Sequence, residues 1–379
     1  MTPDPPPADP VEPALFNPSY EPPPPPGRSG ATYAVARLLG RMGWRLNLAL
    51  FLLTIGTTTL CGALNYGEGT VSPASLSAWI MAGLSYSLPV VFILGAHEMG
   101  HYLACRYYRV DATLPYFLPA PPPFMFGTLG AVIRMRPPMP GRRALFDIGI
   151  AGPIAGFVAA VPVLAYGIAT ARIEQVPRSV EGALVMYYGD PLLSKLLAWR
   201  SHGAIPGGSD IIMNGWLMAG WFGLLVTAMN LFPVGQLDGG HVTFAISPRL
   251  HRLLARFSIA GMIGLVSASF LAPVTNLWLA GVLLAVALWI CWRRLPRIVA
   301  WIVGLGTAAG VAYCSSVGIF TAWLLWTGIL ILMGRRPHPP ICGDDGRLGA
   351  FRVALALAAL AIFVLSFIPF PLEVVAGGG

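Results

Sequence analysis

The sequence has 379 residues, of which 56% are hydrophobic and only 11% are charged, and its mean hydropathy is +0.69. This composition is too apolar and too poor in charge for an ordinary soluble domain, and it indicates a protein that crosses a membrane several times. The formal net charge of +8 comes mainly from arginines that are grouped between apolar runs. Because they form no basic stripe interleaved with aromatic side chains, they indicate membrane topology and exclude a nucleic-acid partner.

The first thirty residues are rich in proline and contain several acidic residues. They have neither the basic start nor the apolar centre of a signal peptide, and they do not resemble a transit peptide. Runs such as Pro22 to Pro26 favour an extended polyproline conformation and cannot bury enough surface to fold. We therefore expect residues 1–30 to form a disordered cytoplasmic tail.

About nine apolar runs follow, each close to the roughly 20 residues that a helix needs to cross a bilayer. They lie near residues 46–64, 76–108, 145–170, 211–230, 257–271, 275–292, 298–314, 317–333 and 351–370. The run 76–108 is too long for one straight crossing, so we expect a helix that is kinked or broken at Pro89. The sequence thus predicts an all-α polytopic membrane protein with about 8–9 transmembrane helices.

Arginines at the ends of these runs predict the orientation. Arg37, Arg41 and Arg45 precede the first run, and positively charged segments stay on the cytoplasmic side of a membrane. We therefore expect the N-terminus to lie in the cytoplasm. The expected location is the cytoplasmic (inner) membrane of a bacterium, as a multi-pass protein.

A segment of different character lies between the second and third runs. A cluster of prolines excludes a helix there, whereas the stretch that follows favours a strand. We expect a short membrane-associated β-hairpin or strand near residues 110–136. Its unpaired edge could bind an extended substrate by strand addition, which makes Gly127, Thr128 and Gly130 candidate substrate-binding residues. The alternative is a hairpin that only plugs the helix bundle.

The second run contains the motif His97-Glu98-x-x-His101. Two histidines four residues apart project from the same face of a helix, so their ring nitrogens can converge on one zinc ion. Glu98 is then placed to take a proton from a water molecule that the metal activates. Ionisable groups at membrane depth are costly, so three of them within five residues of an apolar helix indicate a function.

A catalytic zinc ion needs a third protein ligand. Asp238 is the leading candidate, because it follows an apolar run and precedes Gly239 and Gly240. An aspartate at that position can begin a helix and keep its carboxylate free to point back at an ion. The expected topology brings Asp238 and the histidine pair to the same depth, toward the cytoplasmic side.

Three motifs together resemble the site-2 protease family of intramembrane zinc metalloproteases, which is peptidase family M50. They are the His97–His101 motif, the segment Phe146–Pro153, and the run from Asn230 through Pro233 to Gly240. The resemblance implies hydrolysis of peptide bonds in membrane-spanning protein substrates, with zinc held by His97, His101 and Asp238. It also implies that Asn230 contacts substrate or stabilises the oxyanion, although Asn230 could equally cap a helix end.

The organisation within this resemblance is compact. The connection 171–210 is too short for a PDZ domain, and no regulatory domain is expected after the last run, so the chain resembles the subgroup without such modules. Residues 31–256 are expected to form the catalytic core, and residues 257–379 are expected to add C-terminal transmembrane helices.

Two other functions compete with the protease. Glu98 and the three ligand candidates could instead line the path of a zinc or proton transporter, although the later runs carry few charges at membrane depth. A non-catalytic scaffold is disfavoured because Glu98 and all ligand candidates are present. The expected partners are membrane-spanning protein substrates and the lipid bilayer, and the sequence leaves the oligomeric state open.

Overall fold

The computed structural model describes residues 30–66, 76–122, 124–136, 139–175, 184–271, 322–334, 338, 341, 346, 348–369 and 371–376. The expectations for residues 1–29 and for the runs 275–292 and 298–314 lie outside these ranges. The chain divides into two compact units, Met1–Leu46 and Asn47–Gly379. The first unit contains the beginning of helix α1 (Gly30–Tyr66), which is kinked at Gly43, where φ is +49°.

Helices make up most of the second unit. They are α2 (Leu76–Tyr107), α3 (Arg142–Ala169), α4 (Leu192–His202), α5 (Gly215–Asn230), α6 (Asp238–Ile246), α7 (Pro248–Leu271), α10 (Ala322–Met333) and α11 (Gly349–Ser366). The strands of the described residues form three antiparallel pairs: β1 (Tyr116–Pro119) with β2 (Thr128–Val132), β3 (Ile173–Gln175) with β5 (Ser209–Ile211), and β4 (Leu184–Tyr188) with β6 (Leu372–Ala376). The predicted helical architecture with a hairpin near 110–136 is confirmed, and the other two strand pairs were not predicted.

Four of the described helices are long and apolar enough to cross a membrane. They cover Gly43–Asn65, Leu76–Tyr107, Arg142–Ala169 and Gly349–Ser366. Helix α5 has 16 residues and extends only ~24 Å, less than the thickness of a bilayer core. The first half of α7 carries three arginines, which lowers its hydropathy. The described residues thus establish a multi-pass membrane protein, and the count of about 8–9 transmembrane helices stays a prediction.

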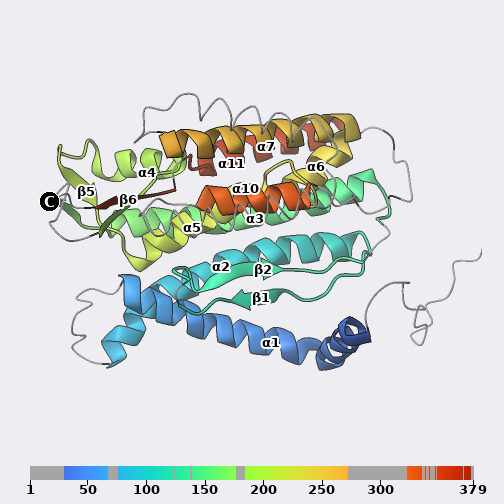
Figure 1. Cartoon of the computed structure of the whole chain (residues 1–379), viewed down its shortest axis with the longest axis horizontal. Coiled ribbons are helices and arrows are strands. Elements are labelled where there is room, and N and C mark those ends of the chain that lie inside the picture. Colours follow the sequence, from blue (N-terminus) through green and yellow to red (C-terminus); the bar gives the residue numbers. More distant parts are fainter. Residues whose placement is uncertain are drawn as a thin grey trace, which may run out of the picture. The chain divides into compact units, whose positions relative to one another are not determined.

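Helices α2, α3 and α5 pack against one another at the centre of the second unit (Figure 1). Glycines permit the close approach of their backbones. A Cβ atom on Gly100 of α2 would lie 2.5 Å from the carbonyl oxygen of Ala151 in α3, and one on Gly220 of α5 would lie 2.6 Å from Cα of Leu164. No side chain fits at such distances, so small residues set the helix spacing, as is typical of membrane helices.

Helix α2 continues as one helix of 32 residues past Pro89. The break that the sequence allowed at this proline therefore does not occur. Pro89 is buried among neighbouring helices, and such neighbours can stabilise a proline-containing membrane helix. As a consequence the helix carries the His-Glu-x-x-His motif on an unbroken C-terminal half.

The β1–β2 hairpin is fixed to the helices by side chains that bind its backbone. Asn47 Nδ2 donates to the carbonyl oxygens of Leu114 and Pro115, at 2.9 Å each, and Tyr86 Oη donates to the carbonyl oxygen of Phe126 at 2.9 Å. Figure 1 shows β2 running beside α2, with β1 on the side of β2 that faces away from α2. The hairpin therefore has a defined position next to the motif-bearing helix.

A half-buried ion pair joins the C-terminal helix to the core. Arg352 of α11 binds Asp147 of α3 in a bidentate manner, with Nε–Oδ1 at 2.9 Å and Nη2–Oδ2 at 2.7 Å. Tyr108, just after α2, donates to the same carboxylate. The two charged side chains are 22% and 23% exposed, so water weakens their attraction much less than it weakens that of a surface pair.

We expect Arg352→Ala to lower the free energy of unfolding by about 1–3 kcal/mol, because it leaves a partly buried carboxylate without its cation. Thermal unfolding of the purified protein in detergent should show a midpoint lowered by a few degrees. Arg136→Ala is the matched control, because Arg136 and Asp111 form a pair that is 68% and 65% exposed. That variant should change stability by at most about 1 kcal/mol. Equal effects of the two substitutions would contradict this role of Arg352.

Candidate metal centre

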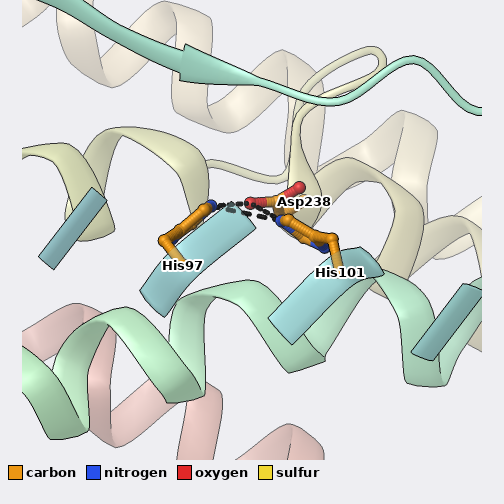
Figure 2. Close-up of side chains that lie close together, drawn as sticks. All are labelled: His97, His101 and Asp238. Carbon is orange, nitrogen blue, oxygen red and sulfur yellow. Dashed lines mark hydrogen bonds and ion pairs between the residues drawn. The ribbon is translucent and has the colours of Figure 1, made fainter. Parts of the chain in front are cut away.

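His97 and His101 lie on the same face of α2 and point toward Asp238, the first residue of α6 (Figure 2). The Nε2 atoms of the two histidines are 3.2 Å apart. Each is also 3.2 Å from Oδ2 of Asp238. Within the described part of the chain, this is the only group of histidine, cysteine or acidic residues in which three potential ligand atoms lie within 4.8 Å of one another.

Helix α3 holds the two histidine rings in place. His101 Nδ1 lies 2.7 Å from the carbonyl oxygen of Ile148. A protonated Nδ1 donates to that carbonyl, which leaves the lone pair of Nε2 directed toward Asp238. A Cβ atom on Gly152 would lie 2.1 Å from His101 Nε2, and one on Gly156 would lie 3.0 Å from His97 Nδ1. Gly152 and Gly156 therefore form the surface of α3 against which both rings lie.

Asp238 reaches the histidines because the chain folds back tightly between α5 and α6. A Cβ atom on Gly239 would lie 2.0 Å from the carbonyl oxygen of Leu231, and one on Gly240 would lie 2.2 Å from that of Gly235. Both positions are closed to any larger residue. The two glycines after Asp238 thus permit the return of the chain that brings a carboxylate from α6 to a histidine pair on α2.

The donor set fits a zinc ion. Zinc binds imidazole nitrogen and carboxylate oxygen at about 2.0–2.2 Å in tetrahedral geometry, which places neighbouring ligand atoms roughly 3.3 Å apart. The three separations of 3.2 Å match this spacing. Two histidines and one carboxylate also leave a fourth position open, as in catalytic zinc sites.

Glu98 is buried beside His97 but is not part of the ligand group. Its carboxylate is hydrogen-bonded to the backbone of Ile133, which directly follows β2. Glu98 thus adjoins a candidate ligand in the sequence and contacts the hairpin backbone.

Asn230 is the last residue of α5, and its Nδ2 lies 3.3 Å from His97 Nε2. The structure thus brings Asn230 next to the candidate metal ligands.

Gly127 and Thr128 lie in the hairpin and hold it in place. Gly127 accepts a hydrogen bond of 2.7 Å from Thr57 through its carbonyl oxygen, and Thr128 Oγ1 donates to the carbonyl oxygen of Leu118 at 2.9 Å. Gly130 has φ of +100° and open space at its Cβ position.

The support from α3 was missed as a functional feature. Gly152 and Gly156, which lie against the rings of His101 and His97, were not among the predicted site residues. Their spacing on one helical face was the available signal. The sequence alone does not show whether a glycine allows a neighbouring helix to pack closely or makes room for a histidine ring.

A separate cavity of about 400 Å³ lies far from this centre. It is lined by residues of α4 and β5, the C-terminal end of α3 and the N-terminal end of α5, including Ile168, Ser194, Asp210 and Leu217. Ile168 is about 24 Å along α3 from Gly152, which contacts His101. This cavity is therefore not the site of the metal cluster.

Sequence comparison relates this chain to known zinc metalloproteases. The model of peptidase family M50 matches residues 85–274, half of the chain. The protein named "Probable zinc metalloprotease EGY1, chloroplastic" from Arabidopsis thaliana is 30% identical over 210 residues, covering 51% of this chain and 38% of that protein. Its namesake from Oryza sativa subsp. japonica is 25% identical over 303 residues, covering 78% and 42%. "Probable zinc metalloprotease EGY2, chloroplastic" from Oryza sativa subsp. indica is 30% identical over 190 residues, covering 50% and 33%.

The matched region includes all the residues of the metal centre, and the chain belongs to peptidase family M50. It spans about two fifths or less of the length of these relatives. No solved structure matches it.

Proposed function

We propose that this protein is an intramembrane zinc metalloprotease that hydrolyses peptide bonds of membrane-spanning protein substrates. The observation that carries the proposal is the approach of Asp238 in α6 to His97 and His101, which lie with Glu98 on a helix that can cross a membrane. A zinc ion bound by these three residues supplies Lewis-acid chemistry, which polarises a carbonyl group and makes water nucleophilic at neutral pH.

Glu98 acts in this proposal as the general base. Its carboxylate takes the proton of the attacking water and passes it to the leaving amine. Its hydrogen bond to the backbone of Ile133 keeps the carboxylate directed toward the side from which a substrate would approach. Asn230 lies close enough to His97 to donate a hydrogen bond to the oxygen that becomes negatively charged on the substrate carbonyl.

The hairpin supports a role in substrate binding. The backbone of Ile133 contacts Glu98, and Leu129 and Val132 of β2 are 64% and 48% exposed. An extended segment that lay along this part of the hairpin would pass the general base. A transmembrane helix has its carbonyl groups hydrogen-bonded internally, so a substrate must unwind locally before it can be cut, and strand pairing would stabilise the unwound segment. Gly127, Thr128 and Gly130 would contribute by fixing the hairpin's shape.

The transporter alternative finds no support among the described residues. An ion path would require Glu98 to join the ligands in a chain of sites across the membrane. Instead Glu98 lies outside the ligand group and faces the hairpin. That arrangement suits a proton acceptor in hydrolysis.

We further propose the orientation that the arginines predict, with the N-terminus and the metal centre toward the cytoplasm of a bacterium. The proposed catalytic core comprises residues 31–256. Elements after residue 257 pack on that core, since α11 contacts α3 and α5 and β6 pairs with β4. The partners in this proposal are membrane-spanning protein substrates and the surrounding lipid.

Removal of zinc should abolish cleavage. A single-span reporter reconstituted with the purified protein is expected to be cut by the zinc-loaded form and to remain intact after treatment with a strong chelator, because His97, His101 and Asp238 then hold no Lewis acid. Added zinc should restore cleavage. A chelator that is already saturated with zinc is the control and should leave the rate unchanged. Persistent cleavage by protein shown to be metal-free would refute the proposed function.

A further inference from the structure

Three histidines gather outside the catalytic group, on the C-terminal side of Asp238. His241 lies on α6, His251 on α7, and His338 follows α10. His241 and His251 are buried, with 5% and 8% of their surfaces exposed, and His338 is half-buried. The three rings thus come from three separate elements of the chain.

The geometry of these rings resembles that of the catalytic pair. Nε2 of His251 and Nε2 of His338 are 3.2 Å apart, the same separation as between the Nε2 atoms of His97 and His101. The ring centroids of His251 and His338 are 4.6 Å apart, and those of His241 and His338 are 5.5 Å apart. The catalytic pair has 4.9 Å. Two nitrogens bound to one zinc ion would lie roughly 3.3 Å apart.

The surrounding contacts orient His251 as they would orient a metal ligand. His251 Nδ1 is 3.0 Å from Thr243 Oγ1, and that hydroxyl donates to the carbonyl oxygen of Gly239 at 2.7 Å. A histidine whose Nδ1–H donates to an oxygen presents the lone pair of Nε2, which is the usual arrangement behind a ligating imidazole. The ring of His338 is stacked on Phe244, with centroids 4.0 Å apart.

Hydrogen bonding within the cluster leaves two ring nitrogens unused. Nδ1 of His241 and Nδ1 of His338 are buried and have no hydrogen-bond partner. Buried polar atoms are normally paired, so two unpaired nitrogens within one cluster call for an explanation. Coordination through a rotated His241 ring would give Nδ1 of His241 a partner, whereas an ion held by Nε2 of His338 leaves Nδ1 of that residue unpaired.

The three rings of the cluster are uncharged, as a ligating imidazole must be. Burial lowers the pKa of His241 to about 4 and that of His338 to about 3, and burial with nearby Arg252 lowers the pKa of His251. All three rings are therefore neutral near pH 7, which is the form that binds metals. Neutral imidazole nitrogens without carboxylates select divalent transition metals of the zinc, cobalt, nickel and copper group over magnesium or calcium.

We infer that His251 and His338, with His241 as an adjacent third ligand that joins by rotation of its ring, form a second site for a divalent transition-metal ion. An ion bound there would connect α6, α7 and the segment after α10. Because α6 begins with Asp238, this connection would steady the element that supplies the third catalytic ligand. The second site shares no ligand with the catalytic centre.

Metal stoichiometry tests this inference. The full-length protein in detergent would be stripped of metal, dialysed against zinc or cobalt at graded free concentrations, and assayed by elemental analysis. We expect about two equivalents per chain for the wild type, and about one for His251→Gln, for His338→Gln and for His97→Ala. The double variant His97→Ala/His338→Gln should hold almost none. His338→Cys should recover the second equivalent, because a thiolate can replace imidazole as a ligand.

The control is His202→Gln, because His202 lies outside both clusters and binds the carbonyl oxygen of Ile168. It should retain about two equivalents. A wild type with one equivalent that His97→Ala removes and His338→Gln leaves intact would overturn the second site while preserving the catalytic one. Absorption of the cobalt form separates the sites in the same way, because the signal lost in His338→Gln should differ from the one lost in His97→Ala. Thermal unfolding should show that added zinc stabilises His97→Ala more than the double variant.

Discussion

Glu98→Gln should abolish proteolysis while the protein keeps its zinc. The amide has the same size as the carboxylate and can keep a hydrogen bond to the hairpin backbone at Ile133, but it cannot take a proton from water. Loss of a general base typically lowers the rate by about 10²–10⁴-fold. The measurement is the kcat/KM for cleavage of the membrane-anchored reporter, together with zinc content by elemental analysis.

The matched control is Glu174→Gln, which makes the same chemical change at an exposed position in β3. It should leave both rate and zinc content unchanged. Zinc content in Glu98→Gln equal to that of the wild type would separate a chemical role from a structural one. Wild-type rates in Glu98→Gln would rule out Glu98 as the general base.

Gly152→Ala is expected to cost the protein both its zinc and its activity. The added Cβ would lie 2.1 Å from Nε2 and 2.4 Å from Cδ2 of His101, so the ring must leave its position. The ring is also held by the carbonyl oxygen of Ile148 from the same helix, so displacement breaks that bond and turns the ligand away from Asp238. Changes that disturb the support of a metal ligand cost about 10–100-fold in affinity or activity, and this clash reaches the ligating atom itself.

Gly95→Ala is the control for this second change. It adds the same methyl group to α2, where the nearest heavy atom would be 3.8 Å away, an ordinary contact with Phe117. We expect zinc content and kcat/KM close to those of the wild type. If Gly152→Ala folds, as judged by unfolding in detergent, and still binds zinc normally, then the position of the His101 ring in contact with α3 is wrong.

Features that depend on near neighbours in the sequence were predicted well. The His97 and His101 pair follows from helical periodicity, which fixes the relation of residues four apart on one helix. Asp238 was predicted from a different local signal, an acid followed by two glycines after an apolar run. The structure shows the reason for those glycines, because Gly239 and Gly240 lie against backbone carbonyls where no side chain fits.

Features that depend on distant partners were not predictable from one sequence. The partner of Asp147 is Arg352 of the C-terminal helix, and nothing near Asp147 in the sequence indicates that. His251 and His338 are 87 residues apart in the sequence, yet their rings meet. The contact of Glu98 with Ile133 likewise depends on how the hairpin is fixed beside α2.

The candidate ligands come from α2 and α6, two helices that the β1–β2 hairpin, α3, α4 and α5 separate along the chain. A zinc ion held by α2 and α6 at once would therefore cross-link the two helices. Zinc binding and the approach of α6 to α2 would then be coupled, because each favours the other. At a free zinc concentration about 1,000 times the dissociation constant, that coupling favours the closed arrangement by about 4 kcal/mol. Zinc supply would then regulate how long α6 stays closed, in addition to supplying the chemistry of cleavage.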